Sequence, residues 1–332
     1  MPNPDAKLST KVFADDVGRA ATRDGFGVGV VEAGEADERV VVLCADLKES
    51  TRAEMFEEKF PLRFVEVGVA EQNLVALASG MAAAGKVPFA ASYAVFSPGR
   101  NYEQIRTTIA LNGSNVKVVG MHAGVSVGPD GATHQMLEDI GMMRMLPGMV
   151  VIAPGDAEEA RKAVLAAAKH DGPVYLRFGR AATPVFTTSE TPFEIGKALT
   201  LWSPPAGGEK PAVAIFSTGS LGHAALLAAR ALEAAGTGAL VLHLPTVKPL
   251  DEEAVLAAAS SVRAIVTVEE HLVAGGLGSA VAELLGERSP IRIRRIGVKD
   301  VFGQSGTSDE LLAHYGLDAA AIVTAVSSLA QA

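Results

Sequence analysis

The chain has 332 residues, 48% of them hydrophobic, and a formal net charge of -9 at pH 7. This length predicts two domains, and the hydrophobic content excludes a disordered chain. The acidic balance argues against nucleic acid or an anionic membrane as a partner. No apolar run approaches the ~18 residues that cross a bilayer, and the charged N-terminus does not resemble a secretory signal. Cys44 is the only cysteine, so no intrachain disulfide is expected and we predict a cytoplasmic protein.

Strand-like and helix-like segments alternate along the first 180 residues. In chain order the patterns predict a helix over 11–26, strands over 39–46 and 61–68, a helix over 71–83, a strand over 86–94, a helix over 100–112, a strand over 116–124, a helix over 135–145, a strand over 149–156, a helix over 157–169 and a strand over 172–179. The strands are continuous apolar runs, as in buried parallel sheets. The alternation predicts an α/β fold, with a mostly parallel sheet flanked by helices on both faces.

A segment rich in Thr, Pro, Ser and Gly follows, over 181–211, and predicts a linker that contains a short extended piece. The pattern then restarts with strands over 212–219, 239–247, 264–271 and 291–298, and helices over 221–235, 251–259 and 277–286. This predicts a second, smaller α/β domain. We place the domains at 1–188 and 211–332, with a linker over 189–210.

Glu71 is the single acidic residue at the turn between the strand over 61–68 and the helix over 71–83. Ligands usually bind where strands of an α/β sheet end. A carboxylate among Val, Leu and Ala is expected to be partly desolvated, and such a group can keep or share a proton near neutrality. The alternative from local sequence is a surface glutamate at the first turn of a helix.

Several motifs, in order, resemble the C-terminal half of the transketolase family of thiamin diphosphate enzymes. They are VGVAEQNLVALASGMAAAG, ASYAVFSPGRNYEQIR, HAGVSVGPDGATHQMLEDIGMMRMLPGMVVIAPGD, YLRFGR and KDVFGQSGTSDELLAHYGLD. The resemblance covers nearly the whole chain. It implies a pyrimidine-binding domain followed by a transketolase C-terminal domain. It also implies transfer of a two-carbon ketol group from a ketose phosphate to an aldose phosphate, a reaction of the pentose phosphate pathway.

The family's diphosphate-binding domain, with its Gly-Asp-Gly signature, has no counterpart in this sequence. The resemblance therefore implies one half of a split transketolase, whose N-terminal partner subunit brings the diphosphate site and the metal ligands, with Mg²⁺ as the default metal. It further implies a heterotetramer in which two copies of this chain form the central contact. The Gly-rich segment 274–279 opens a helix but lacks an acidic metal ligand, so it is a weak candidate for a phosphate loop.

The resemblance assigns the cofactor's aminopyrimidine to three kinds of residue. Glu71 matches the glutamate that hydrogen-bonds the ring and activates it. Tyr93 and Phe96 match the aromatic residues that pack on the ring, and Tyr102 is a further candidate that could instead be a core aromatic. The family's third aromatic position falls on Gly99, a departure that loosens the expected pocket. Asp46 matches a position near the cofactor.

The polar loop after residue 121 matches the substrate loop of the family. His122, Asp130 and His134 match residues that contact the hydroxyls and carbonyl oxygen of the sugar, and His122 and His134 can donate, accept or move a proton near pH 7. Glycines at 128 and 131 predict a tight turn. The three residues lack the compact spacing of a metal site, and the alternative for each histidine is a buried ring satisfied by a backbone carbonyl.

Basic residues and one serine match positions that bind the phosphate of the sugar. Arg180 is the main candidate, because a guanidinium presents a fork of donors to phosphate. Arg177 could share this role or face solvent, and Arg100 is a weaker candidate. Lys11 is the local match to an arginine near the start of this half of the family, and Ser50 matches a position near the substrate phosphate.

Three other functions remain open from the sequence. They are the C-terminal half of a 1-deoxyxylulose-5-phosphate synthase-like enzyme, the beta subunit of a 2-oxoacid dehydrogenase, and a non-catalytic assembly subunit. KDVFGQSG and LEDIGMMR favour transketolase over the first, and DGATHQ argues against the second. Retention of Glu71 together with the polar loop argues against the third. No catalytic group is expected in the smaller domain, where His223 and His271 are predicted to be structural.

Overall fold

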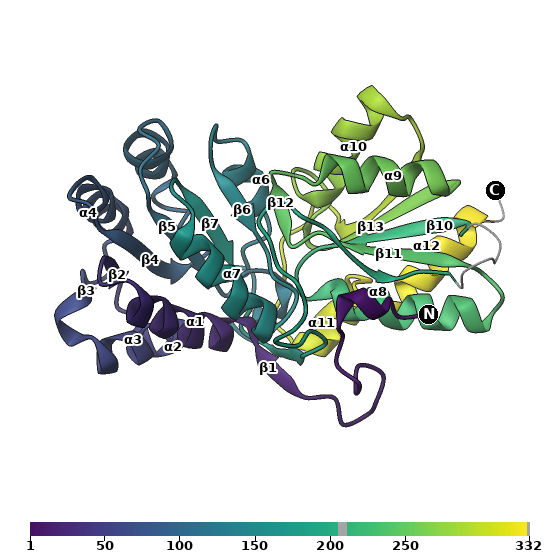
Figure 1. The fold of residues 1–332 in the computed structure, drawn as a ribbon, viewed down its shortest axis with the longest axis horizontal. Coiled ribbons are helices and arrows are strands. Elements are labelled where there is room, and N and C mark those ends of the chain that lie inside the picture. The colour runs from purple at the N-terminus through teal and green to yellow at the C-terminus, as the bar shows by residue number, and fades with distance from the viewer. Residues whose placement is uncertain (205–210, 331–332) are drawn as a thin grey trace.

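The computed structural model describes residues 1–204 and 211–330, which form two lobes that lie side by side (Figure 1). The first lobe is built on a seven-stranded sheet of order β12-β6-β7-β5-β4-β2-β3. Its strands are β2 (Val40–Cys44), β3 (Phe64–Glu66), β4 (Val87–Tyr93), β5 (Lys117–Met121), β6 (Val150–Ile152), β7 (Val174–Arg177) and β12 (Thr246–Lys248). All neighbours are parallel except β12, which pairs antiparallel with β6. The predicted α/β fold is confirmed.

Helices cover both faces of this sheet. They are α1 (Thr22–Ala36), α2 (Lys48–Thr51), α3 (Glu54–Lys59), α4 (Glu71–Ala83), α5 (Tyr102–Gln104), which continues as a π-helix over Ile105–Ala110, α6 (Asp139–Arg144) and α7 (Ala157–Lys169). Successive side chains of β2 point to opposite faces of the sheet and belong to two separate clusters of the hydrophobic core. Val40 and Val42 pack with α1 and α7, whereas Val41 and Leu43 pack with α4 and the π-helix. A strand buried on both faces therefore needs the continuous apolar run seen in the sequence.

The helix predicted over 11–26 is wrong, because the chain is in turns until β1 (Arg19–Ala21) and α1 begins only at Thr22. Glycines in α1 lower its helix propensity and so concealed it. They are required by packing: a Cβ at Gly25 would lie 2.0 Å from the carbonyl oxygen of Ala157, and one at Gly29 would lie 2.9 Å from that of Arg161. The glycine face lets α1 approach α7 more closely than alanine would allow.

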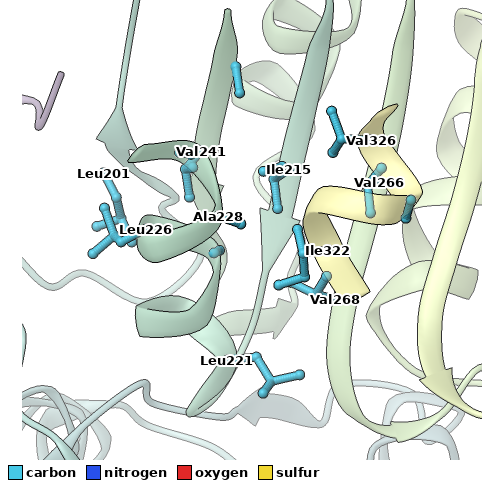
Figure 2. Packing of buried hydrophobic residues seen from close by; sticks show 14 of the residues in the cluster. Leu201, Ile215, Leu221, Leu226, Ala228, Val241, Val266, Val268, Ile322 and Val326 are labelled. Atoms are coloured by element: carbon cyan, nitrogen blue, oxygen red, sulfur yellow. The ribbon is translucent and has the colours of Figure 1, made fainter. Parts of the chain in front are cut away.

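The second lobe is a five-stranded sheet of order β14-β13-β10-β11-β9. Its strands are β9 (Leu199–Trp202), β10 (Val213–Ser217), β11 (Ala239–His243), β13 (Ala264–Leu272) and β14 (Arg292–Val298), and its helices are α8 (Leu221–Ala234), α9 (Glu252–Ser261), α10 (Leu277–Arg288), α11 (Ser308–His314) and α12 (Ala319–Ala330). Only β9 is antiparallel to its neighbour. Ile215 of β10 packs under α8 and α12 (Figure 2), and Phe216 faces α9 and α10. The predicted second α/β domain is confirmed.

Near the boundary, each lobe contributes a short segment that hydrogen-bonds to the other lobe. Residues 246–248 of the second lobe form β12 in the first sheet, and Asn3 donates from its backbone to the Leu201 carbonyl oxygen at 2.9 Å. The predicted linker contains β9, which joins the second sheet. The strand β8 (Ala182–Pro184) precedes the linker in the chain and pairs with β1. Residues 205–210 of that linker lie outside the described residues. The boundaries 1–188 and 211–332 stay predictions.

The segment Ser308–Leu329 has the length of a membrane span and a mean hydropathy of 1.3, although the sequence analysis found no such run. It consists of two helices, α11 and α12, separated at Gly316, whose φ is 67°. Ile322 and Val326 of α12 are fully buried against the second sheet, as Figure 2 shows. The apolar composition of α12 is thus accounted for by packing in the core.

Candidate active site

Most of the predicted site residues lie at the edge of the first sheet where its parallel strands end. Tyr93 is the last residue of β4, His122 directly follows β5, and Arg180 lies three residues after β7. These three strands are neighbours in the sheet. Side chains at their carboxyl ends therefore converge, and this edge is the usual ligand-binding edge of an α/β fold.

Glu71 begins α4, and its side chain is only 5% exposed. Arg100 Nη1 donates to both carboxylate oxygens, at 3.1 Å to Oε1 and 3.2 Å to Oε2. Asn101 Nδ2 donates to the Glu71 carbonyl oxygen at 2.8 Å, which ties the start of α4 to the aromatic segment. The carboxylate borders a cavity of about 470 Å³ that Val69 and Gln72 also line. Arg100, the weaker candidate for a phosphate ligand, is paired with Glu71, and its role toward phosphate stays a prediction.

Tyr93 and Phe96 form a stacked pair of rings, with 5.8 Å between centroids and 20° between planes. The Arg100 guanidinium lies over Phe96, with Cζ 4.0 Å from the ring centroid, and the same guanidinium bonds Glu71. The Arg100 guanidinium thus contacts both the face of Phe96 and the carboxylate of Glu71. A flat heterocycle such as an aminopyrimidine needs a face to stack on and a hydrogen-bonding group at its edge, and these residues supply both.

Two positions of the aromatic segment do not join this group. The Tyr102 hydroxyl donates to the Met142 carbonyl oxygen at 3.1 Å, and its ring packs against the core beneath the sheet, in line with the core-aromatic alternative. At Gly99 a Cβ would lie 1.9 Å from the Val95 carbonyl oxygen. An aromatic residue at 99 would therefore require the backbone to move.

The two histidines of the polar loop contact the aromatic pair. The His122 ring stacks on Tyr93, with 4.0 Å between centroids, and His134 meets Tyr93 and Phe96 edge-on, at 6.3 Å and 5.6 Å. His122 has a left-handed backbone, with φ 54°. Such a conformation is uncommon for a residue other than glycine, and strain of this kind concentrates at functional sites.

The middle of the polar loop is held by Arg180. Its Nη1 donates to Asp130 Oδ2 at 3.0 Å and to the Val127 carbonyl oxygen at 3.1 Å. Gly128 and Gly131 have φ of 87° and 73°, so the loop turns at the two predicted glycines. The ion pair brings Asp130 and Arg180, 50 residues apart, to the same place.

Arg23 is a member of the cluster that the sequence analysis missed. Its Nη1 lies 3.1 Å from His122 Nε2 and donates to the Ser50 carbonyl oxygen at 2.9 Å. Together with Tyr93 and Arg180, these residues line a cavity of about 300 Å³. Arg52 and Glu49 line it as well, and three arginines against one carboxylate suit a phosphate group. The available signal was a single arginine in the first turn of a glycine-rich helix, in the run AATRDGFG.

Lys11 and Asp46 are placed differently. Lys11 is exposed and pairs with Asp16. Asp46 is exposed with φ 59°, and its backbone N–H donates to Glu66 Oε1 at 2.7 Å. Among the contacts of the described residues, none joins either side chain to the cluster, so their proposed roles stay predictions.

Burial and neighbouring charge act together on His122. The ring is 1% exposed, and burial, then Arg23, then Arg180 lower its pKa to about 3, while the nearby carboxylate of Asp130 opposes this. The imidazole is therefore neutral at physiological pH. Its Nε2 accepts from Arg23, which leaves the proton on Nδ1. The Nδ1 atom is buried and has no hydrogen-bond partner among the described residues, and the neutral ring adds no positive charge to the cavity that it lines.

This depressed pKa predicts an acid-sensitive fold. Relative to the unfolded value of 6.5, His122 contributes stability that is complete above pH 6.5 and is lost as the pH falls toward 3. At pH 5 the loss is about 2 kcal/mol. We expect His122→Asn to show a smaller drop in unfolding free energy between pH 7.5 and pH 5 than wild type, measured by urea denaturation. Equal drops for both proteins would show that His122 is not buried as described.

Arg177 neither shares the phosphate site nor faces solvent. It is buried, its Nε donates to Asp139 Oδ2 at 2.8 Å, and its Nη2 donates to the Glu270 carbonyl oxygen at 2.8 Å. Tyr175 donates to the same Asp139 oxygen at 2.8 Å. Because Glu270 belongs to β13, Arg177 links the two sheets and has a structural role.

The Gly-rich segment 274–279 does not offer an open phosphate loop. The backbone amides of Leu277 and Gly278 donate to the Glu269 carboxylate, at 2.7 Å and 2.8 Å. The start of α10 is therefore occupied by the protein's own anion. His271 Nδ1 and His223 Nε2 each lie 2.8 Å from a backbone carbonyl oxygen, as expected of structural histidines.

A cavity of about 510 Å³ lies elsewhere, between the β1–β8 ribbon and helices α8 and α11. Its lining is mainly apolar and contains none of the predicted site residues. Within residues 1–204 and 211–330, no three His, Cys, Asp or Glu side chains are grouped so that they could hold a metal ion. The chemistry carried by this chain therefore centres on the cluster between Glu71 and Arg180.

Comparison with known families matches two successive models. Residues 19–185 match the transketolase pyrimidine-binding domain, and residues 207–322 match the transketolase C-terminal domain. A proposed transketolase C-terminal section from Methanocaldococcus jannaschii is 44% identical over 90% of this chain and 93% of its own length. A 6-deoxy-6-sulfo-D-fructose transketolase subunit from Clostridium sp. is 41% identical over 93% of this chain and 94% of its own.

A solved structure agrees with these matches. The chain superposes on one described as a split gene transketolase, inactive beta4 tetramer, with a TM-score of 0.86 and 43% identity. The superposition covers 94% of this chain and 98% of the other. The similarity thus extends over both lobes and over a chain of nearly the same length.

Proposed function

Because the chain belongs to the transketolase family, we propose that it is the C-terminal subunit of a split transketolase that moves a two-carbon ketol group between sugar phosphates. The observation that carries this proposal is the position of Tyr93. Its ring contacts both Phe96 and His122, so the aromatic group beside Glu71 and the polar loop form one site. A cofactor ring on the first and a sugar on the second would be adjacent.

Thiamin diphosphate supplies the nucleophilic carbon that breaks and forms carbon–carbon bonds in such transfers. In this chain Phe96 and Tyr93 would hold its aminopyrimidine, and Glu71 would hold a proton at the ring edge. We place the diphosphate and Mg²⁺ on the partner subunit.

The polar loop would orient the sugar. His122 and His134 would contact substrate hydroxyl and carbonyl oxygens, and His134 can exchange a proton with them. Asp130 can accept from a hydroxyl. Arg23 and Arg180 would bind the terminal phosphate, with Ser50 beside them. A relative named for a sulfosugar raises a second substrate class, because a sulfonate is also an oxyanion that these arginines could hold.

The exposed face of α4 would contact a second copy of the chain. That face carries small and apolar residues beside Glu71: Ala76, Leu77, Gly80 and Ala83. Val69, which lines the cavity beside Glu71, is 69% exposed. Exposed apolar patches of this kind mark interfaces, and a similar chain forms a tetramer. We propose a heterotetramer of two such chains and two N-terminal subunits.

Ketol transfer from xylulose 5-phosphate to ribose 5-phosphate, with thiamin diphosphate and Mg²⁺, tests this proposal. We expect activity only when the chain is mixed with its N-terminal subunit, and a heterotetrameric mass for the active complex. Robust turnover by the chain alone, or an active complex with one copy of this chain, would contradict the split assembly. Pyruvate decarboxylation in place of ketol transfer would favour a 1-deoxyxylulose-5-phosphate synthase-like or 2-oxoacid dehydrogenase activity. Absence of activity with every substrate would favour a non-catalytic subunit.

A further inference from the structure

Arg100 makes two contacts at once in this site, one with an aromatic ring and one with a carboxylate. Its guanidinium lies over Phe96, with Cζ 4.0 Å from the ring centroid, and its Nη1 donates to both oxygens of Glu71. A planar cation is well suited to both, because it can stack on an aromatic face while its edge donates hydrogen bonds. An aminopyrimidine that bonds Glu71 and stacks on Phe96 would make the same two contacts.

We propose that Arg100 occupies, in the subunit without cofactor, the position on Phe96 and beside Glu71 that the aminopyrimidine ring takes on binding. This inference rests on the proposed function, since it concerns the same cofactor. It makes Arg100 a positioning residue: its guanidinium holds the Glu71 carboxylate in place and must leave before the ring can enter. Binding of thiamin diphosphate is accordingly weakened by the free energy of the contacts that Arg100 gives up.

Burial explains why such a residue is needed. The Glu71 side chain is 5% exposed, and a buried carboxylate without a partner is strongly unfavourable. The Arg100 side chain is 51% exposed, so it can return to solvent at small cost once another group satisfies Glu71. The backbone at residue 99 leaves no room for a side chain, so the residue that covers Phe96 comes from the next position.

The test is the affinity of the reconstituted complex for thiamin diphosphate, measured by calorimetry at fixed Mg²⁺. We expect Arg100→Ala to bind the cofactor about five- to tenfold more tightly than wild type, as the loss of one partly exposed ion pair and one cation–π contact predicts. Arg100→Gln, which keeps a polar chain without charge, should show a smaller gain and covers the case in which Arg100→Ala fails to fold. Arg106→Ala, at an exposed arginine of the same segment, should leave the affinity unchanged.

The outcomes separate this inference from the proposed function. A gain with Arg100→Ala that disappears in the Glu71→Gln background supports displacement of Arg100 by the ring. Unchanged or weaker binding of thiamin diphosphate by Arg100→Ala would overturn the displacement of Arg100. Arg100 would then have only a structural role in the pocket, because loss of a structural residue is not expected to tighten binding. If the wild-type complex binds no thiamin diphosphate, the proposed function fails and this inference fails with it.

Discussion

Replacing Glu71 by Gln is expected to lower kcat for ketol transfer in the reconstituted complex by about 10²–10⁴-fold, the range for loss of a positioned proton-transfer group. Gln keeps the size and the hydrogen-bonding capacity of the side chain but cannot hold a proton for exchange. The buried carboxylate has no substitute, since the nearest polar side chain is the permanently charged Arg100. The measurement is steady-state kcat at saturating thiamin diphosphate with xylulose 5-phosphate and ribose 5-phosphate.

The control for this variant is Glu103→Gln, at an exposed glutamate in α5, three residues after Arg100 in the chain. It removes the same charge from the same region and should keep near wild-type activity. Thermal melting of each variant and assembly with the N-terminal subunit show that the fold is intact. A Glu71→Gln complex that retains more than about a tenth of wild-type kcat would remove Glu71 from the chemistry.

Replacing Arg177 by Met is expected to lower the free energy of unfolding by about 3–5 kcal/mol, because it leaves the buried carboxylate of Asp139 without its cation. Asp139 is fully buried, and after the substitution only Tyr175 remains hydrogen-bonded to it. The link to the Glu270 carbonyl oxygen is lost as well. Urea denaturation at pH 7.5, monitored by circular dichroism, measures the change.

The matched control is Arg288→Met, which removes the same side chain from an exposed pair with Glu252. Exposed pairs contribute little, so the change should be within about 1 kcal/mol. Combining Arg177→Met with Asp139→Leu should recover part of the stability, because neither buried charge is then left unpaired. Similar losses of unfolding free energy in Arg177→Met and Arg288→Met would show that the buried pair contributes no more to stability than an exposed pair.

Local pattern predicted most of the first sheet and the turn that carries Glu71. The run over 39–46 is apolar at every strand position and the run over 116–124 is apolar at every strand position but Lys117, and β2 and β5 are buried at every residue. Such runs need no knowledge of neighbours, because a strand covered on both faces must be apolar throughout. The pattern failed at α1, where glycine lowers helix propensity but close packing on α7 demands it.

The partners of long polar side chains could not be predicted in the same way. Arg23, Arg100 and Arg177 look alike in sequence, yet one lines the phosphate-sized cavity, one holds Glu71 and one joins the two sheets. Which group each meets depends on the order of the strands and on the direction of loops far away in the chain. An arginine side chain reaches several ångströms in many directions, so its own neighbours in sequence do not select its partner.

The sequence by itself determined the alternating α/β architecture, the second domain and the family, because apolar periodicity and ordered motifs are local properties that survive without coordinates. Tertiary structure alone decided that Tyr93 joins Phe96 to His122, that Tyr102 belongs to the core, and that Arg100 covers Phe96. These contacts arise because adjacent parallel strands end at one edge and bring together residues separated by many others along the chain. The site therefore depends on the order of the strands, which brings together residues that the sequence could only predict individually.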